Sequence, residues 1–305
     1  MIYSPLAVKI CGVDFKNPVI TASGTFAFGF EFSKLFDIDK LGGISVKGVT
    51  REKREGNPGP RIAETYGGVL NSVGLQNPGV EVFINNFLPF LQSKKAAVIV
   101  NIAGNTESDY CYLAERLSGT GVSMIELNIS CPNVKEGGLA FGVKPDTIQS
   151  ITREVKKRSK KPLIVKLSPN VADIAENARA AEYGGADAVS LINTVRGMAV
   201  DADTRRPLLK NITGGLSGPA IKPIALAMVW QVYNAVKIPI IGMGGIMTAN
   251  DAVEFILCGA TAVQVGTGNL INPLTASNII DGLRKYVEKN KLGNLQEIRG
   301  KLLID

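Results

Sequence analysis

One thiol, Cys131, stands just past an apolar run in the segment ELNISCPNVKEGG (residues 126–138), with asparagines on both sides. It could act as a nucleophile, as a general base, or not at all if it is an inert buried thiol. A nucleophilic cysteine of the protease kind needs a histidine, and the chain of 305 residues contains none. A general base needs nearby cations or hydrogen-bond donors that favour the thiolate. Because asparagine amides donate and accept together, the segment favours a planar amide or imide ligand beside the thiol.

Two lysines interrupt apolar runs: Lys47 lies in ISVKGV and Lys166 in LIVKLS. A buried ammonium group is costly unless it meets an anion. That anion is either a ligand or cofactor that both lysines share, or a carboxylate on a neighbouring strand, for which Glu126 is a candidate. Two lysines at the same rim favour the anionic ligand.

Two glycine-rich turns come late in the chain, at Gly244–Gly245 and at Gly266–Thr267. Glycine lets the backbone approach a ligand closely and direct successive N–H groups at it. Such turns predict a phosphate site, and the alternative is that these glycines only make tight turns.

Composition excludes several classes of function. Hydrophobic residues make up 45% of the chain and charged residues 20%, which is typical of a globular protein with a large core. The net charge of +7 favours small anionic ligands, whereas an aromatic content of 6% argues against nucleic-acid binding. The absence of histidine excludes Ser-His-Asp triads and His-ligated metals.

The four cysteines are widely spaced and form no CxxC pair, which argues against a metal site or a disulfide framework in this chain. We expect Cys11, Cys111 and Cys258 to pack as small core residues. No apolar run is long enough to span a membrane, and residues 1–17 carry no signal-peptide pattern. The expected location is therefore the cytoplasm.

Short apolar runs alternate with helical patterns along the whole chain. Eight runs predict strands buried on both faces of a parallel sheet, at residues 18–23, 43–48, 97–104, 124–130, 162–168, 188–193, 238–245 and 262–268. Amphipathic segments predict helices at 106–119, 173–186 and 219–236, an exposed helix end at 153–161, and a helix from a Thr248 cap to Gly259. Eight βα repeats predict an α/β fold, the (β/α)8 or TIM barrel. A doubly wound sheet is the competing fold, but its glycine-rich first turn is missing.

We expect a single barrel domain over residues 1–305, with an N-terminal extension (1–17) and long loops at 50–68 and 194–218. These loops follow predicted strands two and six, so they should rise over the C-terminal face, where such barrels keep their active sites. Polar or glycine residues end nearly every predicted strand at that face: Ser23, Lys47, Asn101, Asn128 with Cys131, Lys166, Asn193 with Thr194, and the two glycine turns.

Six motifs in order, NISCPNVKEGG, GNPGPRIAET, LNSVGLQNPG, VKLSPN, INT and GMGGI, closely resemble the dihydroorotate dehydrogenase family, in its NAD-linked two-subunit class (class 1B, catalytic subunit), over essentially the whole chain. The resemblance implies FMN at the barrel mouth, lined by Ser23, Lys47, Gly48, Asn101, Asn128, Lys166, Ile192 and Gly218, with its phosphate at Gly244, Gly245, Gly266 and Thr267. It implies substrate contacts from Lys47, Asn71, Ser72, Val73, Gly74, Leu75, Asn128, Asn193 and Thr194, and Cys131 as the catalytic base.

The implied reaction is the oxidation of (S)-dihydroorotate to orotate, a step of de novo pyrimidine biosynthesis. Cys131 would remove a proton while the flavin takes a hydride, and Lys166 would stabilise the negative charge that accumulates. The class further implies a partner subunit that carries FAD and a 2Fe-2S cluster and passes electrons to NAD+, in a heterotetramer with two copies of each subunit.

Four alternatives stay open at this point. A homodimeric, fumarate-using dihydroorotate dehydrogenase would share most of the motifs. A flavin-dependent dihydrouridine synthase would need an RNA-binding appendage, and the chain stops soon after the last barrel helix. A flavin-free phosphate-binding barrel would purify colourless. An inactive scaffold would have little reason to keep Cys131 and Lys166.

Overall fold

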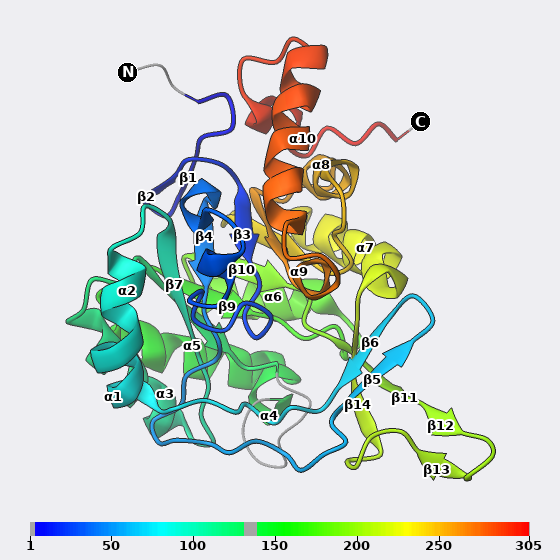
Figure 1. Ribbon diagram of the computed structural model, residues 1–305. Helices are drawn as coiled ribbons and strands as arrows, with labels where there is room; N and C mark the ends of the chain where they lie inside the picture. Colours follow the sequence, from blue (N-terminus) through cyan, green and yellow to red (C-terminus); the bar gives the residue numbers. More distant parts are fainter. Residues whose placement is uncertain (1–3, 131–138, 305) are drawn as a thin grey trace.

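A closed barrel of eight parallel strands forms the centre of the protein (Figure 1). The computed structural model describes residues 4–130 and 139–304. The barrel strands are β3 (Val19–Thr21), β4 (Gly43–Ser45), β7 (Ala97–Ile102), β8 (Met124–Asn128), β9 (Leu163–Lys166), β10 (Ala188–Leu191), β15 (Ile240–Met243) and β16 (Ala262–Val265). Each lies within one of the eight predicted runs, so the predicted (β/α)8 barrel is confirmed.

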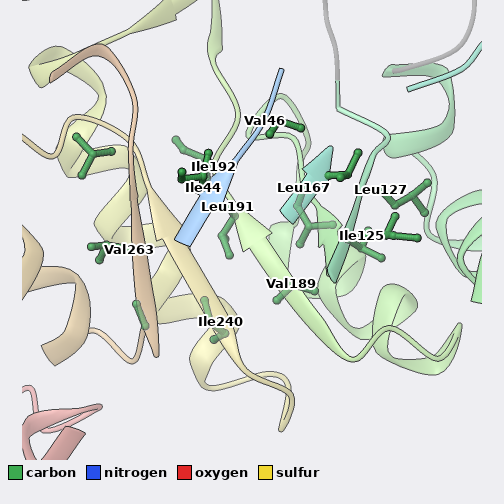
Figure 2. Close-up of a cluster of buried hydrophobic side chains, with 14 of the residues drawn as sticks. Ile44, Val46, Ile125, Leu127, Leu167, Val189, Leu191, Ile192, Ile240 and Val263 are labelled. Carbon is green, nitrogen blue, oxygen red and sulfur yellow. The ribbon is translucent and has the colours of Figure 1, made fainter. Parts of the chain in front are cut away.

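The barrel strands are buried on both faces and are largely apolar, apart from inward-pointing polar residues toward their C-terminal ends. Side chains that point outward pack against the surrounding helices. Figure 2 shows this outer layer, which includes Ile44, Ile125, Leu127, Val189, Leu191, Ile240 and Val263. Strands buried in this way are held firmly in register, and their C-terminal ends are fixed relative to one another.

Helices surround the barrel. Two of them begin where the sequence predicted a helix start, at Thr106 and Thr248. Thr106 and Thr248 each form a capping box with an aspartate three residues later. The main helices are α3 (Glu107–Ser118), α5 (Pro145–Arg158), α6 (Ile174–Tyr183), α7 (Lys222–Tyr233), α8 (Ala249–Leu257) and α10 (Thr275–Lys289). Shorter pieces are α1 (Val80–Val82), α2 (Leu88–Gln92), α4 (Leu139–Gly142), α9 (Thr267–Ile271), the π-helical turn η3 (Phe83–Phe87), and the 3-10 turns η1 (Phe32–Lys34), η2 (Ile38–Lys40), η4 (Pro219–Ile221) and η5 (Leu295–Ile298).

A hairpin of β1 (Val8–Ile10) and β2 (Val13–Phe15) closes the N-terminal end of the barrel. Val8, Ile10 and Phe15 are buried in one cluster with apolar side chains from inside the barrel. Four isoleucines from alternate strands belong to that cluster: Ile20, Ile99, Ile164 and Ile241. The interior is thus packed and sealed at this end, as expected for a barrel of this size.

The opposite end carries a four-stranded antiparallel sheet, which we call the roof sheet. It consists of β5 (Ile62–Thr65), β6 (Gly68–Asn71), β14 (Thr213–Ser217) and β11 (Val195–Met198), and the small pair β12 (Val200–Asp201) and β13 (Arg206–Pro207) lies beyond it. Figure 1 shows the hairpin at the top left and the roof sheet at the lower right. The sequence predicted long loops in this region, and the strands within them were not predicted.

The cysteines differ in part from the prediction. Cys258 is buried in the core, whereas Cys11 and Cys111 are half-buried and pack at its edge. Within residues 4–130 and 139–304, no helix is both long and apolar enough to cross a membrane.

Candidate active site

A cavity lies between the C-terminal ends of the barrel strands and the roof sheet. Its floor comes from strand-end residues such as Asn128, Lys166 and Met243, and its cover from roof-sheet residues such as Val69 and Ser217. The cover combines segments that are far apart in the sequence, since β6 pairs with β14 in the roof sheet.

Most of the predicted site residues lie around this cavity. They are Ser23, Lys47, Gly48, Asn71, Val73, Leu75, Asn128, Lys166, Ile192, Asn193, Thr194, Gly218, Gly244, Gly245, Gly266 and Thr267. Three others, Ser72, Gly74 and Asn101, do not line it. Asn101 is fully buried, and its Oδ1 lies 2.8 Å from the place that a Cβ on Gly48 would occupy. Cys131 lies outside the described residues.

Twelve lining residues were not predicted from the sequence: Ala22, Gly24, Thr25, Ile62, Val69, Ser217, Ile221, Met243, Ile246, Gln264, Gly268 and Leu270. Strand alternation could have found two of them, because Gln264 lies two residues before Gly266, and Met243 lies two residues after Ile241, which points into the barrel. Ile62, Val69 and Ser217 belong to the roof sheet, and they could not be placed without knowing its pairing.

Lys166 is a buried cation at the cavity floor. Only 5% of its surface is exposed, and it pairs across the β8–β9 ladder with Asn128. Among the described residues, no ion pair or hydrogen bond involves its ammonium group. Glu126, the carboxylate considered as its partner, accepts hydrogen bonds from neutral side chains instead. The arrangement therefore favours an anionic ligand as the group that balances Lys166.

Lys47 is half-buried and lines the same cavity. Its Nζ is 3.7 Å from the position that a Cβ on Gly24 would occupy, which is an ordinary van der Waals distance. Two cationic side chains thus share one cavity, as the sequence predicted.

The first glycine turn has the geometry of an anion cradle. Gly244 and Gly245 have φ angles of +128° and +74°, which side-chain-bearing residues rarely adopt. In the described part of the chain, the backbone N–H groups of Gly245 and Ile246 donate no hydrogen bond, whereas those of Met247 and Thr248 donate to the Asp251 carboxylate. Two unpaired N–H groups beside Gly266 and Thr267 are suited to phosphate oxygens.

An ion pair between α7 and α8 supports this turn. Lys222 Nζ lies 2.6 Å from Asp251 Oδ1 and 2.9 Å from Glu254 Oε2. Burial raises the pKa of Asp251, but hydrogen bonds from Lys222, Met247 and Thr248 outweigh it and hold the pKa below the ordinary 3.8. The hydrogen bond to Asp251, followed by that to Glu254, raises the pKa of Lys222. Both groups are charged near neutral pH, and the glycine turn is anchored at its far end.

A row of amide side chains crosses the cavity floor. Asn128 Nδ2 donates to Asn101 Oδ1 at 3.2 Å, and Asn128 Oδ1 accepts from Ser130. Asn193 Nδ2 donates to Ser130 O and Oγ, and the Tyr110 hydroxyl fixes the backbone oxygen of Asn128. Amides held in this way present defined donors and acceptors to a flat polar ring.

The fold and the cavity together define a (β/α)8 barrel whose C-terminal mouth is suited to an anionic ligand and a planar polar ring. The family model for dihydroorotate dehydrogenase matches residues 5–287. The chain therefore belongs to the dihydroorotate dehydrogenase family.

Curated relatives of similar length share more than half of their residues with this chain. One from Alkaliphilus metalliredigens is 57% identical over 297 residues, 97% of this chain and 98% of the relative. One from Thermoanaerobacter pseudethanolicus is 55% identical over 300 residues, 98% of this chain and 99% of the relative. One from Petrotoga mobilis is 54% identical over 293 residues, 96% of this chain and 98% of the relative. Each is named as the catalytic subunit of dihydroorotate dehydrogenase B (NAD+).

Proposed function

We propose that this protein oxidises (S)-dihydroorotate to orotate with FMN as the immediate electron acceptor, in pyrimidine biosynthesis. The observation that carries the proposal is one cavity that combines a glycine anion cradle, the buried Lys166 and a row of fixed amides. The family membership and the names of the relatives support the same reaction.

The residues present suit FMN. Its phosphate would lie at the Gly244–Gly245 turn and at Gly266–Thr267, where backbone N–H groups are available. Lys166 would face the anionic part of the ring system, and Ser23, Gly48, Ile192 and Gly218 would complete the walls. When bound, FMN supplies the hydride acceptor of the reaction.

The substrate would lie above the amide row. Asn128, Asn193 and Thr194 would hold the amide and imide edges of the pyrimidine, while Lys47 would meet its carboxylate. The segment Asn71, Ser72, Val73, Gly74 and Leu75, which begins at the last residue of β6, would close over it, and Asn71, Val73 and Leu75 line the cavity. This binding would keep the ring flat and within reach of the reacting groups.

Two bonds to hydrogen break in the reaction. We propose that the Cys131 thiolate takes the acidic proton next to the substrate carbonyl, while the second hydrogen leaves as hydride. Lys166 places a positive charge at the cavity floor, where negative charge gathers in the transition state. Asn101 would act from beneath by holding Asn128 in place.

We further propose that NAD+ is the final acceptor and that electrons reach it through a partner subunit with FAD and a 2Fe-2S cluster, in an assembly of two plus two. The support is the printed name of the relatives, which describes a catalytic subunit of an NAD+ enzyme.

Anaerobic mixing of the flavin-loaded chain with dihydroorotate tests the first proposal. We expect the flavin absorption to bleach with formation of one orotate per flavin. Unchanged absorption at saturating substrate would contradict the reaction.

The acceptor is tested by adding NAD+ or fumarate to the reduced chain. We expect slow reoxidation by NAD+ alone and fast reoxidation once the partner subunit is present. Fast turnover with fumarate in the absence of any partner would instead indicate the homodimeric class.

A further inference from the structure

A polar layer lies inside the barrel, directly beneath the cavity floor. At its centre is Glu126, which is fully buried. Its Oε2 accepts from Ser45 Oγ at 3.2 Å and from Asn101 Nδ2 at 2.7 Å. Its Oε1 accepts from Ser190 Oγ at 2.8 Å and from Gln264 Nε2 at 3.0 Å. A carboxylate with four neutral donors sits where barrels of this kind carry apolar side chains.

The chemistry of the carboxylate sets the direction of its neighbours. A carboxylate accepts hydrogen bonds and does not donate them, so each amide that meets it must present its NH₂ group. Asn101 therefore turns its Oδ1 toward Asn128. Gln264 likewise turns its Oε1 away from Glu126, and that oxygen is buried without a hydrogen-bond partner in the described part of the chain.

Both amides are linked to the cavity. Gln264 lines it directly. Asn101 acts through Asn128, whose Oδ1 accepts from the backbone N–H and the hydroxyl of Ser130. The chain of bonds cannot be reversed at that point, because a backbone N–H only donates. The Glu126 carboxylate at one end and the Ser130 backbone N–H at the other thus require the same direction of the Asn101 and Asn128 amides.

We propose that Glu126 is a positioning residue that fixes the amides of Asn101 and Gln264, and through Asn101 that of Asn128, for ligand binding. Each Glu126 oxygen serves one serine and one amide. A serine hydroxyl can rotate to accept, but an amide must flip. Glutamine at position 126 would present an NH₂ group on one side. It would either reverse Gln264 or face the NH₂ group of Asn101, whose reversal would break the hydrogen bond from Asn128. The identity of the ligands rests on the proposed function.

Three substitutions separate amide direction from packing. Glu126→Gln keeps the volume and loses the acceptor-only character. Glu126→Asp loses a methylene group and keeps that character. Ser190→Ala removes one donor from the same carboxylate without involving an amide, and Ser190 does not line the cavity. The dissociation constants are measured for FMN on the flavin-free protein and for orotate on the flavin-loaded protein, together with thermal unfolding.

In Glu126→Gln we expect at least one of the two dissociation constants to rise about tenfold or more, the scale of one lost hydrogen bond to a charged group. Glu126→Asp should lie between this variant and the unsubstituted protein, and Ser190→Ala should stay within about threefold of it. Near-normal affinities in Glu126→Gln, an equal loss in Ser190→Ala, or a larger loss in Glu126→Asp would overturn the proposal.

A second measurement needs no variant, in case Glu126→Gln does not fold. Hydrogen exchange of the side-chain NH₂ groups, followed by NMR on the flavin-loaded protein, should show strong protection at Asn101 and Gln264. Rapid exchange at both would also overturn the proposal. If orotate binds to none of the proteins while these amides are protected, the proposed substrate fails and the positioning role stands.

Discussion

Lys166 shows how one residue can favour ligand binding while it lowers the stability of the protein without its ligand. Its ammonium group is buried and has no acidic partner among the described residues. Removing such a charge from water costs free energy that only an anion nearby offsets. The side chain therefore contributes more to the loaded protein than to the flavin-free one.

Lys166→Met should raise the free energy of unfolding of the flavin-free protein by about 1–2 kcal/mol, because it removes an uncompensated buried charge. It should also slow flavin reduction by dihydroorotate by about 10²-fold or more, since the charge at the floor is lost. Chemical denaturation and anaerobic stopped-flow absorption measure the two effects. Lys285→Met, on the exposed face of α10, serves as the control. A flavin-free Lys166→Met protein that is less stable than the original would refute the argument.

Cys131→Ala should bind FMN and orotate with little change but lose about 10²–10⁴-fold in turnover, because a general base contributes to the chemical step. Cys131→Ser should recover part of the rate only at raised pH, since a hydroxyl is harder to deprotonate than a thiol. Steady-state rates over a pH series test both variants. A Cys131→Ala enzyme with a near-normal rate at neutral pH would exclude the thiol as the base.

Much of the candidate site follows from residue types at strand ends. Lys166, Asn128 and Gly244 could be predicted because each follows an apolar run whose end must face the barrel mouth. Gln264 was missed because it lies inside its strand, and only the alternation of side chains shows that it points inward. The predicted alternative of a Lys–Glu126 pair could not be decided from the sequence, because it depends on which layer each side chain occupies.

Among the elements, the Lys222–Asp251 pair joins α7 and α8 beneath the glycine turn. The pKa of Asp251 is lowered in the folded state, so the pair adds stability above the unfolded value of about 3.8. That contribution is lost as the pH falls below this value through the folded pKa. On the alkaline side, the pKa of Lys222 is raised, so its contribution is lost only as the pH rises above the ordinary 10.5.

Asp251→Asn should lower the free energy of unfolding by about 1–3 kcal/mol at pH 7, because Lys222 and two backbone N–H groups lose a charged acceptor. FMN affinity should fall as well, since the turn at Gly244–Gly245 loses its anchor. The stability difference from the unsubstituted protein should shrink below pH 4. Denaturation at pH 7 and pH 3.5 measures it, and a difference that is independent of pH would argue against an ionised Asp251.

The elements divide into those that were predictable and those that were not. The barrel strands were predictable because burial on both faces makes them largely apolar. The roof strands are short and partly exposed, and β14 reads TGGLS, with two glycines and no apolar alternation. Their pairing depends on partners distant in sequence, so the segments were expected only as long loops over the barrel mouth.

At the scale of the whole molecule, the two ends of the barrel have separate tasks. The β1–β2 hairpin seals one end with a packed apolar cluster, and the candidate site occupies the other. Stability and ligand binding should therefore respond to different substitutions.

Phe15→Ala should lower the free energy of unfolding by about 3–5 kcal/mol, because it opens a cavity in the seal. The affinities for FMN and orotate should stay within about twofold at a temperature where the variant is folded, since independent sites are additive. Thermal unfolding and ligand titration are the measurements, with Lys9→Ala on the exposed side of the same hairpin as the control. A large loss of affinity in a well-folded Phe15→Ala protein would show that the two ends are coupled.

The roof sheet has a consequence for the order of assembly. Its strands β6 and β14 meet through residues as far apart as Val69 and Ser217, which are separated by 148 positions. On a ribosome, the first half of the cover emerges long before its other half exists. A chain interrupted before residue 195 would lack β11 and β14 and could not enclose a flavin. If the site binds FMN as proposed, retention of the yellow colour would report that both halves of the roof sheet have been made and have met.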